Sequence, residues 1–317
     1  MSASNHPDRP AGSRRAAMKL LATTAAAWWP ASALRAALAD EPPAELRVGF
    51  QKGSVNLALL KLLGLLEQRL PATKVSWAEF PAGPQLLEAL AVGSVDIGAT
   101  GDSPPVFAQA AGKDLFYVGA EPPKPDSSAI LVKPDAPLKT LADLKGRRIA
   151  LQKGSSAHYL TVRAVDKAKL QWSDITPVYL APADARAAFE TGAVDAWAIW
   201  DPYYAATELD LRPRSLTTGA GLSNNNSFYL ASRTFARSHP AAIGVLLEEL
   251  TRADAYVQAN RREAAQLIAD FSGLSLATTH LFISRRPNAP TAPLTTAIVA
   301  DQQRVADAFA RLGLIPR

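Results

Sequence analysis

The chain of 317 residues contains no cysteine. This absence excludes disulfide bonds, thiolate nucleophiles, cysteine-ligated zinc and cysteine-held iron–sulfur clusters. Long hydrophobic runs are also missing. The Ala-rich stretch Leu20–Leu34 is interrupted by Pro30, and no later segment reaches the roughly 20 apolar residues that a membrane span needs. With 48% apolar residues, the chain is instead typical of a globular protein with a sizeable core, either one large domain or two lobes.

Outside the N-terminal residues the chain has no strong excess of positive charge. The chain has 34 Lys and Arg against 29 Asp and Glu, a net charge of +5. Residues 1–39 carry +4 of this, so residues 40–317 are close to neutral. A nearly neutral body has no basic stripe to bind phosphate backbones, so we expect no nucleic-acid partner.

The N-terminal residues have the order of an export signal. Arg14-Arg15 and Lys19 precede the stretch Leu20–Leu34, and Ala37-Leu38-Ala39 has the small-x-small pattern that signal peptidase prefers. The paired arginines favour the twin-arginine route over the general secretory route. We therefore predict that residues 1–39 are cleaved and that the mature protein, starting at Asp40, is soluble in the periplasm.

Two short motifs each occur twice in the chain, in the same order. In each copy an apolar run ends in Gln-Lys-Gly-Ser before a helical segment, and a Gly-x-Val-Asp motif then opens a second apolar run. The repetition predicts two similar α/β halves. The copies are Gln51–Ser54 with Gly93–Asp96, and Gln152–Ser155 with Gly192–Asp195.

Short apolar strands that alternate with helices predict parallel-rich sheets with flanking helices. The segments Ile130–Val132 and Phe228–Leu230 are expected to be strands by which the chain leaves one half and returns to it. This places the second lobe at residues 128–231. The first lobe is then built from residues 44–127 and 232–317, with a cleft between the lobes at the carboxyl ends of the strands.

The strand-to-helix corners predict an anion site. The first N–H groups of a helix have no intrahelical partner and carry partial positive charge, so small residues at a helix start let an oxyanion approach. Gln51 at a strand tip can add amide donors. The other candidate residues at the corners are Gly101, Asp102, Ser103, Gly154, Ser155 and Ser156.

Several of these residues also have an ordinary structural explanation. A small polar residue at one corner is typical of a helix cap, and Asp201 before Pro202 fits a cap followed by proline. Asp102 can either cap a helix or orient another donor to a ligand. His158 can either donate to an anion or face solvent, and both alternatives stay open.

Aromatic residues gather around the second Asp corner. We expect Trp197 to lie in the core and Trp200 to form the floor of an apolar pocket. Lys124 lies in a proline-rich connection and is expected to be solvated. The remaining histidines are not spaced with carboxylates, so we expect no metal site and no cofactor.

Long segments of the chain resemble the aliphatic sulfonate-binding proteins of bacterial ABC importers. The resemblance covers nearly all of the chain after the export signal, and its long runs are more specific than any short motif. The segments that carry it are 46–56, 80–85, 100–105, 119–125, 152–158, 182–189 and 198–204.

The resemblance implies a two-lobed periplasmic-binding-protein fold of type II, with two hinge crossings, that closes over its ligand. It also implies a monomer that delivers alkanesulfonates to a membrane permease with its ATPase, for sulfur acquisition. The cleft positions implied to contact the ligand are Gln51, Gly101, Asp102, Ser103, Gly154, Ser155, Ser156, His158, Trp200 and Asp201.

Two alternatives remain open from the sequence. A receptor for taurine, nitrate or another small oxyanion or pyrimidine ligand would share the lobes and corners, and a free carboxylate such as Asp102 would favour the ammonium of taurine. An enzyme on the same fold is the other alternative. Its known examples depend on cysteine, which this chain lacks, and no spaced acid–base pair is present.

Overall fold

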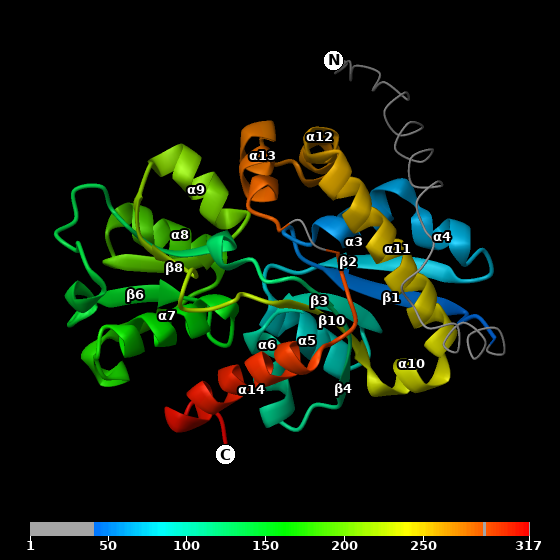
Figure 1. Ribbon diagram of the computed structural model, residues 1–317, viewed down its shortest axis with the longest axis horizontal. Coiled ribbons are helices and arrows are strands. Elements are labelled where there is room, and N and C mark those ends of the chain that lie inside the picture. The colour runs from blue at the N-terminus through cyan, green and yellow to red at the C-terminus, as the bar shows by residue number, and fades with distance from the viewer. Residues whose placement is uncertain (1–40, 288–289, 317) are drawn as a thin grey trace, which may run out of the picture.

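The computed structural model describes residues 41–287 and 290–316, which form two five-stranded sheets side by side with helices packed against them (Figure 1). The predicted export signal at residues 1–39 lies outside the described residues. In the first sheet the order is β2 (Lys74–Glu79), β1 (Glu45–Phe50), β3 (Ile97–Gly101), β10 (Ser227–Ser232) and β4 (Leu115–Glu121). In the second sheet the order is β7 (Thr176–Tyr179), β6 (Arg148–Leu151), β8 (Ala196–Trp200), β5 (Ser128–Val132) and β9 (Arg214–Thr218).

The two sheets repeat one arrangement, as the sequence predicts. β1 is parallel to β2 and β3, and its counterpart β6 is parallel to β7 and β8. The repeated Asp has the same task in both copies, because Asp96 accepts a hydrogen bond from the backbone N–H of Arg47 at 2.8 Å and Asp195 accepts one from Arg148 at 2.7 Å. The two α/β halves inferred from the motifs are therefore present in the strand order.

Each sheet contains one antiparallel strand, and these two strands are connected to the crossings. β5 is antiparallel to β8 and β9, while β10 is antiparallel to β3 and β4. The expected boundary at residue 231 is wrong for β10, because Ser227–Ser232 hydrogen-bonds into the first sheet. The second half of the molecule therefore ends before Ser227, and the chain crosses between the sheets at 122–127 and 219–226.

Helices follow the strands and cover the sheets. Those that belong to the strand-to-helix repeats begin near the strand ends, and the later ones follow β10. The first group is α3 (Val55–Leu63), α4 (Leu65–Arg69), α5 (Gly83–Ala91), α6 (Ser103–Ala110), α7 (Ser156–Lys167), α8 (Pro182–Thr191) and α9 (Tyr203–Leu211). The second group is α10 (Arg233–Ser238), α11 (Pro240–Ala259), α12 (Arg261–Ser272), α13 (Leu276–Ser284) and α14 (Thr296–Arg311). Short 3₁₀ turns are η1 (Pro125–Ser127), η2 (Leu141–Leu144) and η3 (Trp172–Asp174).

Each sheet has its own hydrophobic core. In the first, Val48 of β1 packs among fully buried leucines of α3 and α11. In the second, Ile130 and Leu131 of β5 lie at opposite faces and are both fully buried. Continuous apolar strands of this kind are expected where helices cover both faces of a sheet.

Helix α14 joins the two halves. Its residues Val305 and Phe309 pack with Val106 of α6 and with Tyr159 and Val162 of α7, in a cluster shared by both halves. Figure 1 shows this helix running under the junction of the two sheets. The sequence predicts the C-terminal segment in the first lobe, and α14 packs against α6 of that half and also against α7 of the second half.

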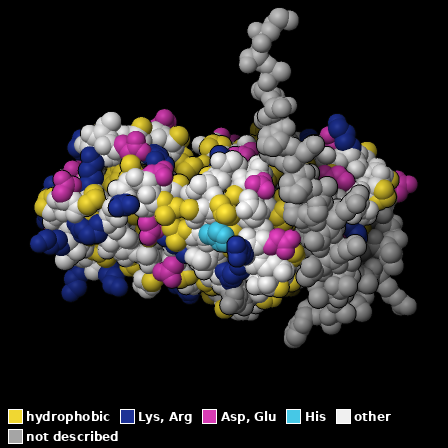
Figure 2. Space-filling model, turned by 90° about the horizontal axis from the view of Figure 1, so that it is seen from above, with side chains coloured by type: hydrophobic (Ala, Val, Ile, Leu, Met, Phe, Trp, Pro, Cys, Tyr) yellow, Lys and Arg dark blue, Asp and Glu magenta, His cyan; other side chains and the backbone are white. Residues whose placement is uncertain are grey.

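Among the described residues, no helix is long and apolar enough to cross a membrane. On the face seen in Figure 2, basic and acidic side chains are interspersed. This distribution agrees with the nearly neutral charge of residues 40–317.

Candidate functional site

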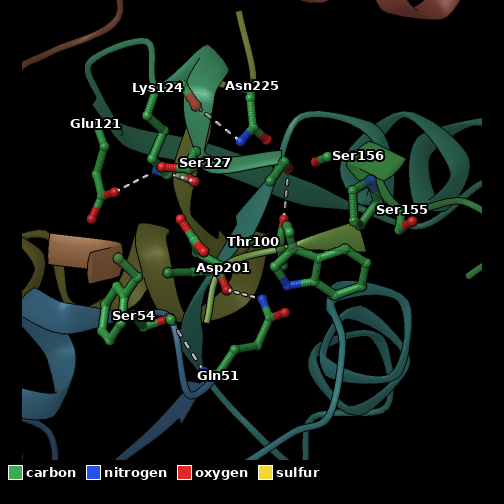
Figure 3. Close-up of a pocket in the computed structure, with 18 of the residues that line it drawn as sticks. Gln51, Ser54, Thr100, Glu121, Lys124, Ser127, Ser155, Ser156, Asp201 and Asn225 are labelled. Carbon is green, nitrogen blue, oxygen red and sulfur yellow. Dashed lines mark hydrogen bonds and ion pairs between the residues drawn. The ribbon is translucent and has the colours of Figure 1, made fainter. Parts of the chain in front are cut away.

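A cavity of about 80 Å³ lies between the two sheets, at the carboxyl ends of their strands (Figure 3). Both halves of the molecule, both crossings and the end of α13 contribute to its wall. Its lining residues are Gln51, Gly53, Ser54, Gly83, Ala99, Thr100, Gly101, Pro104, Glu121, Lys124, Ser127, Ser155, Ser156, Trp200, Asp201, Asn225, Ser227, Phe282 and Arg286.

The corners of the two halves approach each other closely around this cavity. A Cβ atom at Gly101 would overlap the hydroxyl oxygen of Ser156, and one at Gly53 would lie 2.8 Å from the backbone oxygen of Asp201. The Tyr203 hydroxyl donates a hydrogen bond to the Pro81 carbonyl at 3.2 Å, again across the two halves. The structure therefore shows the halves in contact around the cavity.

Three helices begin at the cavity wall. Ser54 precedes α3, Gly101 lies two residues before α6, and Ser155 is the N-cap of α7. The Ser155 hydroxyl accepts a hydrogen bond from the His158 backbone and donates one to the Gln152 carbonyl at 2.7 Å. The backbone N–H groups of Ser54 and Ser155 donate to the carbonyls of Gln51 and Gln152. The helix dipoles still give the wall partial positive charge suited to an anion.

Six of the ten residues predicted for the site line the cavity. Gln51 also donates from Nε2 to the Ala99 carbonyl at 3.0 Å, which fixes its amide at the strand tip and leaves one amide hydrogen. The six are Gln51, Gly101, Ser155, Ser156, Trp200 and Asp201.

Asp102 and Ser103 do not line the cavity. Asp102 is buried beside its neighbour, and its carboxylate accepts a hydrogen bond from the Ser103 hydroxyl at 2.9 Å. Its carbonyl accepts one from Gln302 of α14 at 2.6 Å. Burial raises the pKa of Asp102. The carboxylate is held by the hydroxyls of Ser103 and Ser156, and Asp102 does not line the cavity, so it offers no free carboxylate to an ammonium there.

His158 and Gly154 lie behind the cavity wall. The Gly154 backbone N–H donates to Nδ1 of the fully buried His158 at 3.2 Å, and Gly154 packs against Phe107. Burial, with a contribution from the charge of Lys153, lowers the pKa of His158 to about 3. The imidazole is therefore neutral at physiological pH, and neither expected alternative for it, ligand donor or solvent-facing residue, matches this position.

The surroundings of His158 explain this burial. The centroids of four aromatic rings lie 5.0–6.0 Å from the imidazole centroid. They come from α6, η3, β7 and α14, so His158 is part of the packing that joins the halves. The four residues are Phe107, Trp172, Tyr179 and Phe309.

The aromatic residues of the second Asp corner divide as predicted. Trp197 is fully buried and packs against Phe189 with ring centroids 6.0 Å apart. Trp200 lines the cavity, and its ring contacts Tyr203 edge to face. Phe282 of α13 adds a second aromatic ring to the wall, which the sequence analysis missed. The cavity thus combines polar corners with an apolar surface.

A buried ionic network forms another part of the wall and was also missed. Lys124 Nζ donates to Glu121 Oε2 and to the Ser227 hydroxyl, each at 2.7 Å. Arg286 lies 3.5 Å from Glu121 and 3.3 Å from Asp254. Lys124 is therefore not solvated as expected, because its side chain is only 14% exposed and is bound at a crossing.

Glu121 is ionised in this network. Burial alone would raise its pKa, but the charges of Lys124 and Arg286, with hydrogen bonds from Lys124 and Tyr229, outweigh burial and hold the pKa well below its usual value. The partners that stabilise this carboxylate come from the crossing at 122–127, from β10 and from the C-terminal segment.

Asp201 has one satisfied and one unsatisfied oxygen. Oδ1 accepts hydrogen bonds from the Ala205 backbone at 3.0 Å, as expected of a residue at a helix start, and from Arg285 at 2.9 Å. Oδ2 is buried and has no hydrogen-bond partner among the described residues. Burial, only partly offset by Arg285, raises the pKa of Asp201 to about 7. Asp201 is therefore both a helix-start acceptor and part of the cavity wall.

Within the part of the chain that the structure describes, no group of three or more His, Cys, Asp or Glu side chains is arranged to hold a metal ion.

The Glu121 network predicts a large loss of stability in Glu121→Gln. Removing one partner of a buried charge network leaves the others uncompensated, so the free energy of unfolding at pH 7 should fall by about 3 kcal/mol. Because the folded-state pKa of Glu121 lies below the ordinary glutamate value of 4.5, its contribution is present above about pH 4.5 and is lost as the pH falls. Urea unfolding followed by tryptophan fluorescence would measure both effects.

Glu45→Gln is the matched control, because it removes one carboxylate from the exposed pair of Glu45 and Lys74. Its unfolding free energy should change by less than about 0.5 kcal/mol. An equal, small loss in both variants would show that the Glu121 network does not stabilise the fold.

Known proteins share this fold and much of this sequence. Residues 78–264 match the model of the family described as NMT1/THI5 like. The alkanesulfonate-binding protein SsuA from Xanthomonas axonopodis pv. citri, solved bound to MOPS, is 49% identical, with a TM-score of 0.84 over 87% of this chain and 96% of that one. The periplasmic aliphatic sulphonate-binding protein SsuA from Escherichia coli is 50% identical, with a TM-score of 0.79 over 87% of this chain and 89% of that one.

A more distant relative is named for a different ligand. The taurine-binding periplasmic protein of Escherichia coli (strain K12) is 29% identical over 176 residues, 53% of each chain. At 49–50% identity over most of both chains, the two alkanesulfonate-binding proteins are far more similar. The chain therefore belongs to the NMT1/THI5-like family and, within it, to the aliphatic sulfonate-binding proteins of ABC importers.

Proposed function

We propose that the chain is a periplasmic receptor that binds an alkanesulfonate in the cavity between its two halves and delivers it to an ABC importer for sulfur acquisition. The observation that carries the proposal is the convergence of small residues at three helix starts on one cavity with an aromatic wall. The export signal at residues 1–39 and a permease with its ATPase as partner belong to the same proposal.

The chemistry of a sulfonate matches this wall. A sulfonate is ionised at every physiological pH, so N–H groups and hydroxyls can bind it without proton transfer to the ligand. We assign its oxygens to the corners at Gly101, Ser155 and Ser156, with Gln51 as a further donor. Because the Ser155 hydroxyl already donates to the Gln152 carbonyl, this corner acts through the N-terminus of α7 and not through that hydroxyl. The alkyl chain would then lie against the apolar part of the wall, where Trp200 and Phe282 are found.

The reactive side chains of the chain and of the cavity fit a binding protein better than an enzyme. Reactive cysteine is absent from the chain, and the buried His158 is neutral and behind the wall. The carboxylate of Glu121 is held by two cations, which leaves it a poor proton acceptor. We therefore propose capture and release without turnover, with opening and closing at the two crossings.

Calorimetry with the exported protein tests the proposed ligand class. Ethanesulfonate should bind more tightly than taurine, sulfate or nitrate, because only it combines an oxyanion with an uncharged apolar tail. The buffer has to be free of sulfonate groups, since a relative was solved with the sulfonate MOPS bound. Tightest binding of sulfate or nitrate would refute the alkanesulfonate assignment, and tightest binding of taurine would make the protein an aminosulfonate receptor.

A charge at the α7 corner should abolish binding. In Ser155→Asp the helix keeps its cap, because Asp and Ser are equally good N-caps, but the cavity gains a negative charge facing the sulfonate. We expect ethanesulfonate affinity to fall by roughly 100-fold or more, a loss of about 3 kcal/mol.

Ser155→Asn is the matched control, since it has the same shape as Asp, caps the helix equally well and carries no charge. It should lose much less affinity than Ser155→Asp. If the two variants bind alike in calorimetry, the sulfonate does not lie at this corner.

Closure around the ligand requires a residue without a side chain at position 53, which is Gly53. A Cβ there would lie 2.8 Å from the Asp201 backbone oxygen of the other half, so Gly53→Ala should disfavour the closed state and leave each half folded. An overpacking cost of about 1–3 kcal/mol that applies only to the closed state corresponds to a roughly 5- to 150-fold weaker affinity for ethanesulfonate.

Gly244→Ala is the control for this change, because a Cβ at Gly244 would meet nothing within 4 Å. Its affinity should equal that of the unchanged protein. Unimpaired binding by Gly53→Ala, measured by the same titration, would show that ligand capture does not need this backbone approach.

A further inference from the structure

Asp201 is an unusual residue for the wall of an anion site. It lines the cavity, it is only 8% exposed, and its Oδ2 atom has no hydrogen-bond partner among the described residues. In Figure 3 it lies near the middle of the drawn residues, between the groups labelled Lys124 and Gln51. A buried carboxylate oxygen without a partner is unfavourable unless it is protonated or a ligand satisfies it.

The carboxylates around the cavity make it unfavourable to bind a further negative charge there. Three cations and four carboxylates form the connected networks at the wall and behind it, so these groups are net negative when all are ionised. A sulfonate would add one more negative charge to a buried space. The cations are Lys124, Arg285 and Arg286, and the carboxylates are Glu121, Asp201, Glu208 and Asp254.

The two carboxylates that line the cavity differ in how firmly they are held as anions. Glu121 faces Lys124 and Arg286 and accepts a hydrogen bond from Tyr229. Asp201 faces one cation, Arg285, which it shares with Glu208 of α9. Glu208 is 40% exposed, so water stabilises its charge. Asp201 is therefore the carboxylate that loses least by taking up a proton.

We propose that Asp201 couples sulfonate binding to proton uptake: its carboxyl group is protonated when a sulfonate occupies the cavity, and the proton on Oδ2 is donated in a hydrogen bond to a sulfonate oxygen. One proton moves from solvent to Asp201 for each ligand bound, and no covalent bond to the ligand forms or breaks. The proposal rests on the alkanesulfonate function proposed above and adds a residue that makes binding depend on pH.

The groups that face Asp201 support this direction. From α13, Arg285 stabilises the ionised form; from α9, Glu208 disfavours it, and the Tyr204 ring packs 3.9 Å from the Arg285 guanidinium. The first-sheet corner at Gly53 presents an uncharged backbone. On the rest of the wall Lys124 and Arg286 are already paired with carboxylates. Burial outweighs these attractions and leaves the pKa of Asp201 at about 7 in the free protein.

The sign of the pH dependence follows from this pKa. If the sulfonate binds the protonated form, affinity is highest below pH 7 and falls as Asp201 ionises at higher pH. Since the apparent dissociation constant scales inversely with the competent fraction, ethanesulfonate should bind about tenfold more weakly at pH 8 than at pH 6. At pH 7.5 binding should take up about 0.8 proton per site.

Two measurements on the exported protein test the proposal. Calorimetry gives the dissociation constant of ethanesulfonate from pH 6 to pH 8 in buffers without sulfonate groups. A pH electrode in unbuffered potassium chloride at pH 7.5 gives the proton uptake when ethanesulfonate is added. Both use the unchanged protein, so the test does not depend on the folding of any variant.

Asp201→Asn supplies the matched variant, because its amide is neutral at every pH and can donate a hydrogen bond as the protonated acid does. It should take up no proton and should bind at pH 8 about as tightly as the unchanged protein binds at pH 6. Asp210→Asn changes an exposed carboxylate of α9, the helix that follows Asp201, where Asp210 is paired with Arg186. This variant should keep the proton uptake and the pH dependence.

Three outcomes overturn the proposal. Ethanesulfonate binding that is independent of pH, without proton uptake, would leave the receptor function standing but remove the role of Asp201. Tighter binding of taurine than of ethanesulfonate, weakening below pH 7, would mean that ionised Asp201 accepts a hydrogen bond from an ammonium. Failure of every sulfonate to bind at any pH would remove the proposed function and this inference together.

Discussion

The helix starts at the strand-to-helix corners, with their partial positive charge, are the feature on which the rest of the site depends. They can serve one ligand only if the strand ends of both sheets meet around a single cavity, and this requires close backbone approach between the halves. Glycine at positions 53 and 101 permits that approach, since a Cβ at either would press on Asp201 or Ser156. The small corner residues are therefore required both by the anion and by the contact between halves.

The ionic groups of the wall are arranged to hold the structure rather than to neutralise a ligand. Both lining cations, Lys124 and Arg286, are already paired with the carboxylate of Glu121, and Arg286 also contacts Asp254. These partners join the crossing at 122–127 to the C-terminal segment. Selectivity in our proposal thus comes from directed N–H and hydroxyl donors and from the apolar wall, and a dissociable proton on Asp201 adjusts the charge.

The sequence was sufficient to predict the features that local patterns encode. The repeated motifs predicted two equivalent halves, and the Asp of each Gly-x-Val-Asp motif indeed binds the neighbouring strand. Contacts between distant segments were not predictable in this way. The ionic partners Glu121 and Arg286 belong to segments far apart in the chain, and the rings around His158 come from four elements, so no spacing reveals them. β10 was assigned to the wrong half because a short apolar run has the same pattern in either sheet.

The central claim is that a sulfonate lies in the cavity between the corners, and the composition of the chain offers a direct measurement. Residues 40–317 contain neither cysteine nor methionine, since the two methionines are Met1 and Met18. In long-wavelength diffraction from crystals of the exported protein with ethanesulfonate, every sulfur signal must then come from the ligand. We predict one anomalous peak between Gln51, Gly101 and Ser155. A peak outside the cavity, with the cavity free of anomalous signal, would contradict the claim.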